Sequence, residues 1–166
     1  NDVWKVLESE IIRSTERFNP MGISNVAWSL ATAKRSSPAV WNKLGGAALH
    51  NIQKFNSQDI ANTVWAFATV GHSSPDLFDK VTNLPLSRLR EFTSQKWAYA
   101  TVGLANIVWA YATICHSSPQ LFEKVAEVAL PRLDEFNSQA LANTVWAYAS
   151  VGHSTLHLNF LTRLQR

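Results

Sequence analysis

Cysteine is nearly absent from this chain, and long apolar runs are missing too. Its single cysteine, Cys115, excludes an internal disulfide, and this favours an intracellular or organellar compartment. No apolar run reaches the roughly 18 residues that a membrane-spanning helix needs. No low-complexity tract is present either, so the sequence is typical of a folded chain with no membrane span.

Motifs for catalysis or metal binding are missing as well. The sequence has no Gly-rich phosphate loop, no Ser–His–Asp set and no paired-carboxylate motif. Cys115 precedes His116, but no third group is predicted to orient that histidine. His72, His116 and His153 recur once per repeat, and neighbouring helices lie about 8–10 Å apart, too far to share a zinc ion at bond lengths of about 2 Å. We therefore expect no enzyme, no metal and no cofactor.

What the chain does contain is a nine-residue motif that occurs four times. The copies span residues 60–68, 104–112 and 141–149, with a looser copy at 23–31, and all follow the pattern Leu/Ile-Ala/Ser-Asn-x-Val/Ala-Trp-Ala/Ser-x-Ala. Trp28 and Trp65 are 37 residues apart, as are Trp109 and Trp146. Trp65 and Trp109 are 44 apart, which indicates a seven-residue insert at 97–103. The chain is therefore predicted to be a repeat protein with a 37-residue period.

Each repeat is predicted to contain two helices. The motif has the apolar spacing of an amphipathic helix, here called helix A, and the segment after the next turn forms helix B. Helices A are expected over 20–33, 57–70, 94–114 and 138–151, whereas Pro85 and Pro131 should kink or split two of the helices B. No segment alternates with period two, so no strand is expected.

This pattern predicts the fold class and the domain organisation. We expect an all-α solenoid of stacked helix-turn-helix repeats forming a right-handed superhelix, with helices A on its concave side. A single solenoid segment would span 1–166, and it would be a fragment of a longer chain. Its predicted parts are a half-repeat at 1–19, repeats at 20–55, 56–92 and 93–136, and a partial repeat at 137–166. Because seven residues rotate a helix by almost two whole turns, the insert is expected to lengthen the third helix A rather than form a loop.

The ends of the predicted helices and the turns between them contain residues that commonly cap helices. Asn56 or Ser57 is a plausible N-cap of its helix A. Gly71 can adopt the left-handed conformation that ends a helix, and the serines that follow can cap helix B before Pro75 in its first turn.

Charged residues are sparse in helices A, although the net charge is +3. Most charges fall in helices B, and some basic residues recur there at equivalent positions. They could form a solvated outer face interleaved with carboxylates, or a track for phosphates. These recurring basic residues are Lys43, Lys80 and Lys124, together with Arg88 and Arg132.

The candidate binding residues lie in and beside the motif. One asparagine recurs in every copy, away from the apolar stripe, although asparagine is a poor helix former. It could line a groove for bases or an extended peptide, or it could form a structural ladder between helices. The residue after it varies between copies, as readout positions do in modular RNA-binding repeats, and a basic pair follows the first copy. The candidates are Asn25, Asn62, Asn106, Asn143, Val26, Thr63, Ile107, Thr144, Lys34 and Arg35.

The recurring tryptophans have two interpretations. A tryptophan at the edge of an apolar stripe is usually packed between helices. An exposed tryptophan could instead stack on nucleobases. The small residue that follows each tryptophan suggests close approach between neighbouring helices A.

The motif Phe-Asn-Ser-Gln-x-Leu/Ile-Ala-Asn-x-Val-Trp-Ala-Phe/Tyr-Ala resembles the octotricopeptide and heptatricopeptide repeats, and its period fits the heptatricopeptide form better. These repeats occur in organellar proteins, often alongside a RAP domain, and the FAST-kinase-like proteins share a related pattern. The resemblance covers nearly the whole chain. It implies an α-solenoid in a chloroplast or mitochondrion that binds single-stranded organellar RNA, in transcript processing, stability, translation or ribosome assembly. The alternative that stays open is a non-enzymatic scaffold that contacts protein subunits of a large organellar complex.

Overall fold

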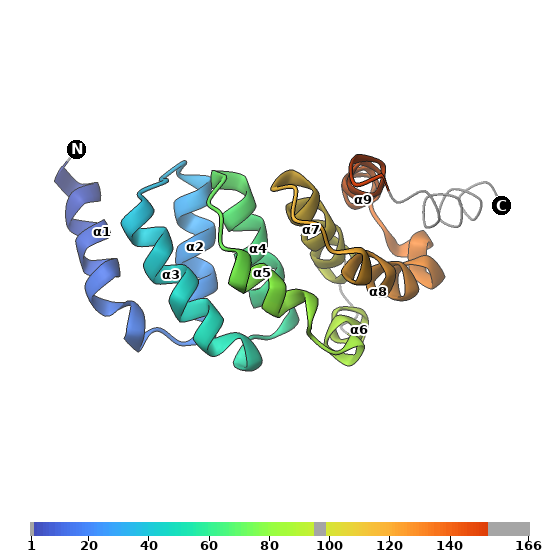
Figure 1. Cartoon of the computed structure of the whole chain (residues 1–166), viewed down its shortest axis with the longest axis horizontal. Helices are drawn as coiled ribbons and strands as arrows, with labels where there is room; N and C mark the ends of the chain where they lie inside the picture. Colours follow the sequence, from blue (N-terminus) through green and yellow to red (C-terminus); the bar gives the residue numbers. More distant parts are fainter. Residues whose placement is uncertain (1, 95–98, 153–166) are drawn as a thin grey trace. The chain divides into compact units, whose positions relative to one another are not determined.

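The computed structural model describes residues 2–94 and 99–152, and every regular element in these ranges is helical (Figure 1). The first half contains α1 (Asp2–Ser14), α2 (Pro20–Thr32), α3 (Pro38–Asn51), α4 (Ser57–Val70) and α5 (Pro75–Thr82). The second half contains α6 (Leu86–Ser94), α7 (Tyr99–Thr113), α8 (Pro119–Ala129) and α9 (Ser138–Ser150). Short 3-10 helices follow α1, α3 and α8, namely η1 (Thr15–Arg17), η2 (Ile52–Lys54) and η3 (Leu130–Glu135). The predicted all-α class is confirmed.

Three of the four predicted helices A agree with the structure to within one residue. They are α2, α4 and α9. The fourth prediction, 94–114, was wrong at its start, because Ser94 is the last residue of α6 and α7 begins at Tyr99. Residues 99–103 of the insert are helical as expected, whereas 97 and 98 lie outside the described residues.

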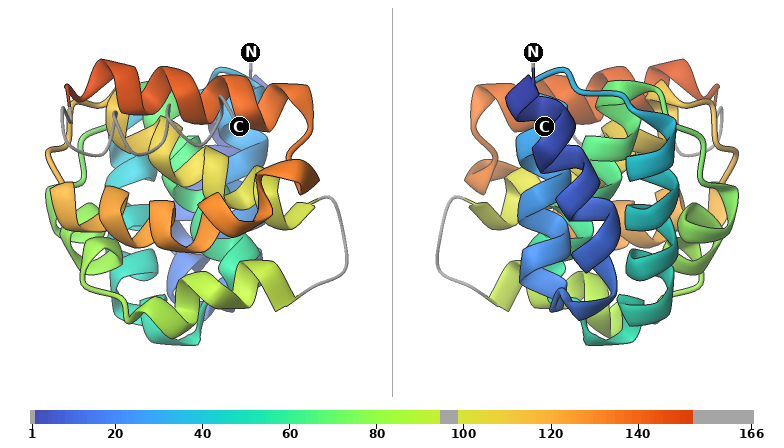
Figure 2. Two further views of the ribbon diagram at one scale, coloured as in Figure 1. Left: turned by 90° about the vertical axis from the view of Figure 1, so that its right-hand side faces the viewer. Right: turned by 90° about the vertical axis from the view of Figure 1, so that its left-hand side faces the viewer.

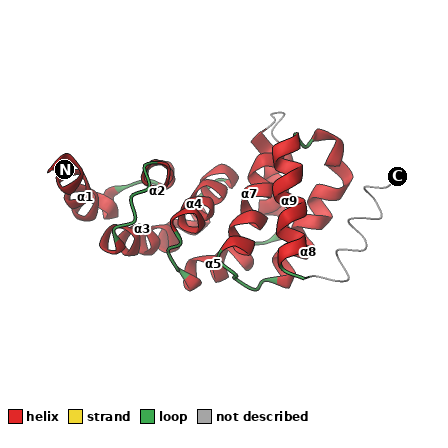
Figure 3. Ribbon diagram, turned by 90° about the horizontal axis from the view of Figure 1, so that it is seen from above, coloured by secondary structure: helices red, strands yellow, loops and turns green. Residues whose placement is uncertain are grey.

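The chain divides into two compact units, Asn1–Val81 and Thr82–Arg166, called unit 1 and unit 2 below. In unit 1, α2 packs along α4, while α3 packs against α1 and α2. Figure 1 shows α3 and α5 nearer the viewer with α2 and α4 behind them, and Figure 3 shows the same arrangement from above. The right-hand view of Figure 2 shows α1 beside α2 and α3. In unit 2, α7 packs along α9, and α8 packs against α6 and α7. Within each unit, successive helices A therefore stack directly on each other; the predicted repeat boundaries and superhelix handedness stay predictions.

Asparagine caps explain where helices A begin. Asn19, Asn56 and Asn137 are the N-caps of α2, α4 and α9, and each side chain accepts a hydrogen bond from a backbone N–H in the first turn. In α4 the bond is reciprocated, since the Asn56 N–H donates to the Asp59 carboxylate at 3.2 Å while the Asp59 N–H donates to Asn56 Oδ1 at 2.8 Å. This capping box satisfies two backbone donors that a helix start leaves unpaired, and it identifies Asn56 rather than Ser57 as the cap.

The turns after helices A follow the predicted chemistry with one exception. Gly71 ends α4 in the left-handed conformation at φ 68°, and Cys115 adopts φ 54° at the matching place after α7. Pro38, Pro75 and Pro119 each begin a helix B. The exception concerns the serines, because neither Ser37 at the N-cap of α3 nor Ser118 at the N-cap of α8 makes a side-chain capping bond. Ser118 instead pairs with the Thr82 hydroxyl at 2.9 Å.

The two internal prolines interrupt helices B as predicted. Pro85 lies between α5 and α6, and Pro131 lies in η3, where the α-helix has already ended. A proline removes one backbone donor and clashes with the preceding turn, so the carbonyls before it need other partners. The Lys124 ammonium supplies one, since it donates to the carbonyl oxygens of Thr82 at 2.9 Å and Leu84 at 3.1 Å. One member of the predicted basic ladder is thus a structural residue.

Aromatic pairs between a helix B and the next helix A fill the cores. In unit 1, Trp41 is fully buried. Its ring meets Phe67 edge-on at a centroid distance of 4.9 Å, and its Nε1–H donates to the Arg35 carbonyl at 2.8 Å. In unit 2, the Tyr148 ring meets Phe122 at 5.1 Å, and its hydroxyl donates to the Phe122 carbonyl at 2.7 Å. Burial of the Tyr148 hydroxyl raises its pKa well above the ordinary value.

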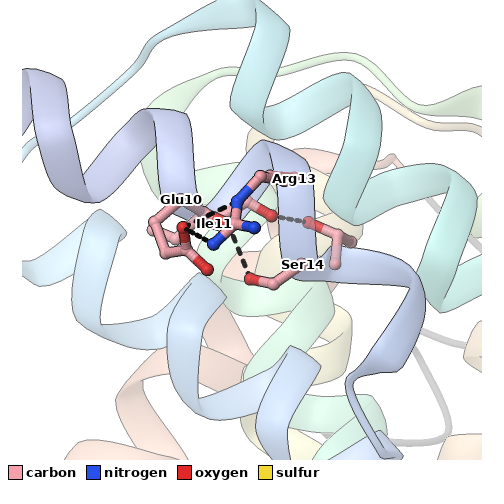
Figure 4. Close-up of polar contacts among 5 residues, drawn as sticks. Glu10, Ile11, Arg13 and Ser14 are labelled. Atoms are coloured by element: carbon pink, nitrogen blue, oxygen red, sulfur yellow. Dashed lines mark hydrogen bonds and ion pairs between the residues drawn. The ribbon is translucent and has the colours of Figure 1, made fainter.

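At the C-terminal end of α1, side chains bond back to the helix carbonyls (Figure 4). The Ser14 hydroxyl donates to the Glu10 carbonyl at 2.6 Å, and Thr15 does the same to Ile11. Glu10 also pairs with Arg13 across the exposed surface. The two hydroxyls therefore supply hydrogen-bond donors to backbone carbonyls at the point where α1 passes into η1.

Candidate nucleic-acid interface

Asparagine and tryptophan form one exposed side of the helices A. Each asparagine precedes its tryptophan by three residues, so both side chains lie on the same side of their helix. We call Asn25, Trp28, Asn62 and Trp65 the Asn–Trp face of unit 1, on α2 and α4. The corresponding face of unit 2 lies on α7 and α9 and consists of Asn106, Trp109, Asn143 and Trp146.

The tryptophans on these faces are open to solvent to an unexpected degree. Trp28 and Trp146 are each 47% exposed, and Trp65 and Trp109 are half-buried. In unit 1 the Trp28 and Trp65 rings are stacked, with centroids 6.5 Å apart and planes inclined by 30°. The predicted packing of tryptophan between helices therefore holds in part, because each unit also presents one exposed tryptophan ring.

The asparagines are placed away from the cores, as their position on the helix predicted. Asn25 is exposed, and Asn62, Asn106 and Asn143 are half-buried. Asn143 Oδ1 accepts a hydrogen bond from Gln139 one turn earlier, at 2.9 Å. Within the described ranges, the other three side-chain amides have no hydrogen-bond partner. A structural ladder would bond each amide to the neighbouring helix, and the described residues contain no such bonds.

The variable residues that follow the asparagines were predicted to line the same surface. For three of the four this was wrong, because their side chains are buried. Thr63, Ile107 and Thr144 are buried, and only Val26 is partly exposed. For Thr63 and Thr144 the reason is that α4 stacks on α2 and α9 stacks on α7, which buries a second side of α4 and α9 in addition to the side that faces helix B. The Thr144 hydroxyl donates to the Ala140 carbonyl at 2.8 Å, whereas the Thr63 hydroxyl is buried without a partner in the described structure.

The small residues that follow the tryptophans occupy the same stacking side. Ala66 on α4 and Ala147 on α9 are fully buried, whereas Ser29 on α2 is exposed. The predicted close approach between helices A is therefore confirmed for the helices that follow another helix A within a unit, as α4 follows α2 and α9 follows α7.

The two basic residues after α2 differ in their availability. Lys34 is exposed and adopts a left-handed conformation with φ 55°. Arg35 is held by α1, because its guanidinium donates to Glu8 at 2.9 and 2.7 Å and lies 5.1 Å from the centre of the Trp4 ring. Arg35 therefore anchors α1, and the prediction that it assists a ligand on helices A is corrected. Both partners, Trp4 and Glu8, are visible in the sequence, but nothing in the sequence indicates that they contact Arg35.

Several recurring basic residues of helices B have acidic or structural partners. Lys43 lies 3.9 Å from Glu16, and Arg88 lies 3.6 Å from Glu91. Arg132 pairs with Glu135, and this hydrogen bond raises the arginine pKa and lowers the glutamate pKa. The interpretation of these residues as an outer face interleaved with carboxylates is the one that these distances support.

The described residues offer no other chemistry that competes with the Asn–Trp faces. They contain no group of three or more His, Cys, Asp or Glu side chains that could hold a metal ion, and no described helix is long and apolar enough to span a membrane. One cavity of about 430 Å³ lies on α3 between Glu16, Lys43 and His50. Because Glu16 and Lys43 carry opposite charges, the cavity favours the binding of neither anions nor cations.

The recurring motif and the stacking of successive helices A within each unit define a helical-repeat protein. The family model of the RNA-editing substrate-binding complex 6 protein (RESC6) matches residues 36–165, and the chain belongs to this family. A family model of a protein of unknown function (DUF1601) matches residues 9–26. No curated protein matches the sequence.

Proposed function

We propose that this chain is a non-enzymatic helical-repeat subunit of an organellar RNA-processing complex, and that it binds single-stranded RNA. Family membership across 36–165 carries this proposal, because the family is named for an RNA-editing substrate-binding complex. The resemblance to heptatricopeptide-type repeats supports the same function and the organellar location. The exposed Asn–Trp faces supply suitable contacts, since amides can bond to base edges and indole rings can stack on bases.

The test is direct binding of RNA to the purified chain. We expect a mixed-sequence single-stranded RNA to bind and its fully paired duplex to bind much more weakly, because unpaired bases are required for stacking. Replacing both Asn62 and Asn106 with alanine should weaken binding while leaving the helical circular dichroism unchanged. Equal affinity for the duplex, or no affinity for either RNA, would refute the proposal.

A protein-binding scaffold is the second candidate, and one observation favours it. Val3, Val6 and Leu7 lie on α1, and each is strongly exposed, Val3 to 65%. Neighbouring exposed apolar side chains on one helix are typical of protein interfaces. If the scaffold function is the principal one, affinity capture from an organellar extract should recover the same protein partners after RNase treatment, and replacing Val3 and Leu7 with serine should abolish the capture.

A further inference from the structure

We infer that unit 1 holds RNA through its bases rather than its phosphates, with Trp28 as the stacking platform and Asn25 and Asn62 as amides that reach base edges. This inference rests on the proposed function and specifies how the same site binds. Three properties of the Asn–Trp face of unit 1 carry it: the presentation of the Trp28 ring, the near absence of charge on α2 and α4, and the unpaired amides beside the ring.

The Trp28 ring is exposed and at the same time held in place. Trp65 on α4 stacks on it, with ring centroids 6.5 Å apart. Its backbone lies inside α2, which begins at the Asn19 cap. A ring that is already fixed loses little conformational entropy when a base stacks on it. Such a platform accepts any base, because every base has a π-face.

The two helices that carry Trp28 and Trp65 bear almost no charge. Helix α2 contains no acidic or basic residue, and the one charged residue of α4, Asp59, is buried. The Asp59 carboxylate is occupied, since it accepts bonds from the Asn56 N–H and from the Ser24 hydroxyl, both at 3.2 Å. Contacts to phosphates are made chiefly by arginine and lysine and release counterions, and this face offers neither residue. This face therefore lacks the cations that attract phosphates, and we expect the uncharged parts of single-stranded RNA, its bases, to lie on it.

The amides of Asn25 and Asn62 are placed to add hydrogen bonds. Each lies one turn before its tryptophan, with Cβ atoms about 5–6 Å apart. Neither amide has a partner among the described residues. An amide both donates and accepts, so it can match the paired donor and acceptor on a base edge. A base that stacks on Trp28 would bring its edge within reach of this amide pair.

An exposed apolar residue near Trp28 provides a control that distinguishes base stacking from nonspecific apolar contact. Met21 lies one turn before Asn25 on the same side of α2 and is 59% exposed. A protein partner that buries this surface would contact methionine and tryptophan alike, whereas a stacked base needs an aromatic ring. Met21→Ala is therefore the control for Trp28→Ala, and Trp28→Phe tests whether a smaller aromatic ring restores binding.

The experiment measures the affinity of the whole chain and its variants for single-stranded RNA across a salt series. We expect Trp28→Ala to weaken binding by about 5- to 150-fold, the range for losing one stacked base, and Trp28→Phe to recover most of it. We expect Asn25→Ala to weaken binding by a smaller factor, and Met21→Ala to leave it unchanged. The slope of log affinity against log salt should be the same for Trp28→Ala as for the wild type, because no phosphate contact is lost.

Three results would overturn the inference while leaving RNA binding intact. They are wild-type affinity in Trp28→Ala, an equal loss in Met21→Ala and Trp28→Ala, and a shallower salt slope in Trp28→Ala. The last would mean that phosphates lie on this face after all. If the wild-type chain binds no single-stranded RNA, the proposed function itself fails, and this outcome is distinct from the other three. A thermal unfolding curve for each variant shows that the protein measured is folded.

Discussion

Two tryptophans of unit 1 should respond very differently to replacement by alanine. Trp41 is fully buried, packs edge-on against Phe67 and donates its N–H to the Arg35 carbonyl. Trp28 is 47% exposed and has Trp65 as its aromatic neighbour. The comparison uses the same substitution in neighbouring helices, so the difference between the variants reports the difference in burial.

The magnitudes follow from the buried area. A tryptophan side chain buries about 150–250 Å² when fully enclosed, which at about 25 cal/mol per Å² corresponds to roughly 4–6 kcal/mol. Mutational data for tryptophan-to-alanine changes in cores give about 3–5 kcal/mol, so we expect about 4 kcal/mol for Trp41→Ala. Trp28→Ala removes about half of that area, and alanine is the better helix former. We therefore expect about 1–2 kcal/mol for Trp28→Ala.

Urea unfolding followed by circular dichroism at the helix band measures both values. With a slope of about 1–3 kcal/mol per molar urea, Trp41→Ala should lower the midpoint by more than 1 M or leave unit 1 unfolded without denaturant. Trp28→Ala should shift the midpoint by less than half as much. Equal destabilisation by the two substitutions would show that Trp28 is as buried as Trp41, and the exposed platform would not exist.

Three further predictions concern single side chains of unit 1. Thr63→Val should raise the free energy of unfolding, measured by calorimetry, by about 1 kcal/mol, because it removes a buried hydroxyl that lacks a partner. Thr144→Val is the control: its hydroxyl is hydrogen-bonded, so no gain in stability is expected. Burial lowers the His72 pKa below its usual 6.5, so the unfolded state takes up the proton first and stability falls as the pH drops through and below 6.5. His72→Gln should flatten this part of the curve of urea midpoint against pH, and an unchanged curve would exclude His72 as its source. Asn56→Ala should cost about 1 kcal/mol, because it removes the acceptor for the Asp59 N–H, and hydrogen exchange should quicken in the first turn of α4; unchanged exchange there would contradict the capping role.

Local signals in the sequence predicted the helices well. The Asn-Ser start narrowed the N-cap of α4 to Asn56 or Ser57, Gly71 marked the end of this helix, and Pro85 and Pro131 marked the breaks in helices B. Each of these effects acts within a few residues along the chain. The start of α7 was missed because α6 extends to Ser94, and the seven-residue insert offered no boundary of its own.

The candidate site was predicted less completely, for a geometric reason. A single helical wheel shows which side of a helix is apolar, but not that a second side is buried when helices A stack, so Thr63 and Thr144 were placed on the wrong side. The same limit hid the exposure of Trp28. Roles that depend on distant partners, such as Arg35 bonded to Glu8 on α1, have no local signature in the sequence.

Crosslinking of bound RNA tests the central claim most directly, because it locates the RNA on the chain. A single-stranded RNA that contains 4-thiouridine would be bound to the full chain, irradiated and digested, and the crosslinked peptides would be identified by mass spectrometry. We predict crosslinks in the peptides that contain Asn25 and Trp28 and in those that contain Asn62 and Trp65. Crosslinks confined to peptides of the helices B, around Lys43 and Lys80, would contradict the claim and place the RNA on the opposite side of the repeats.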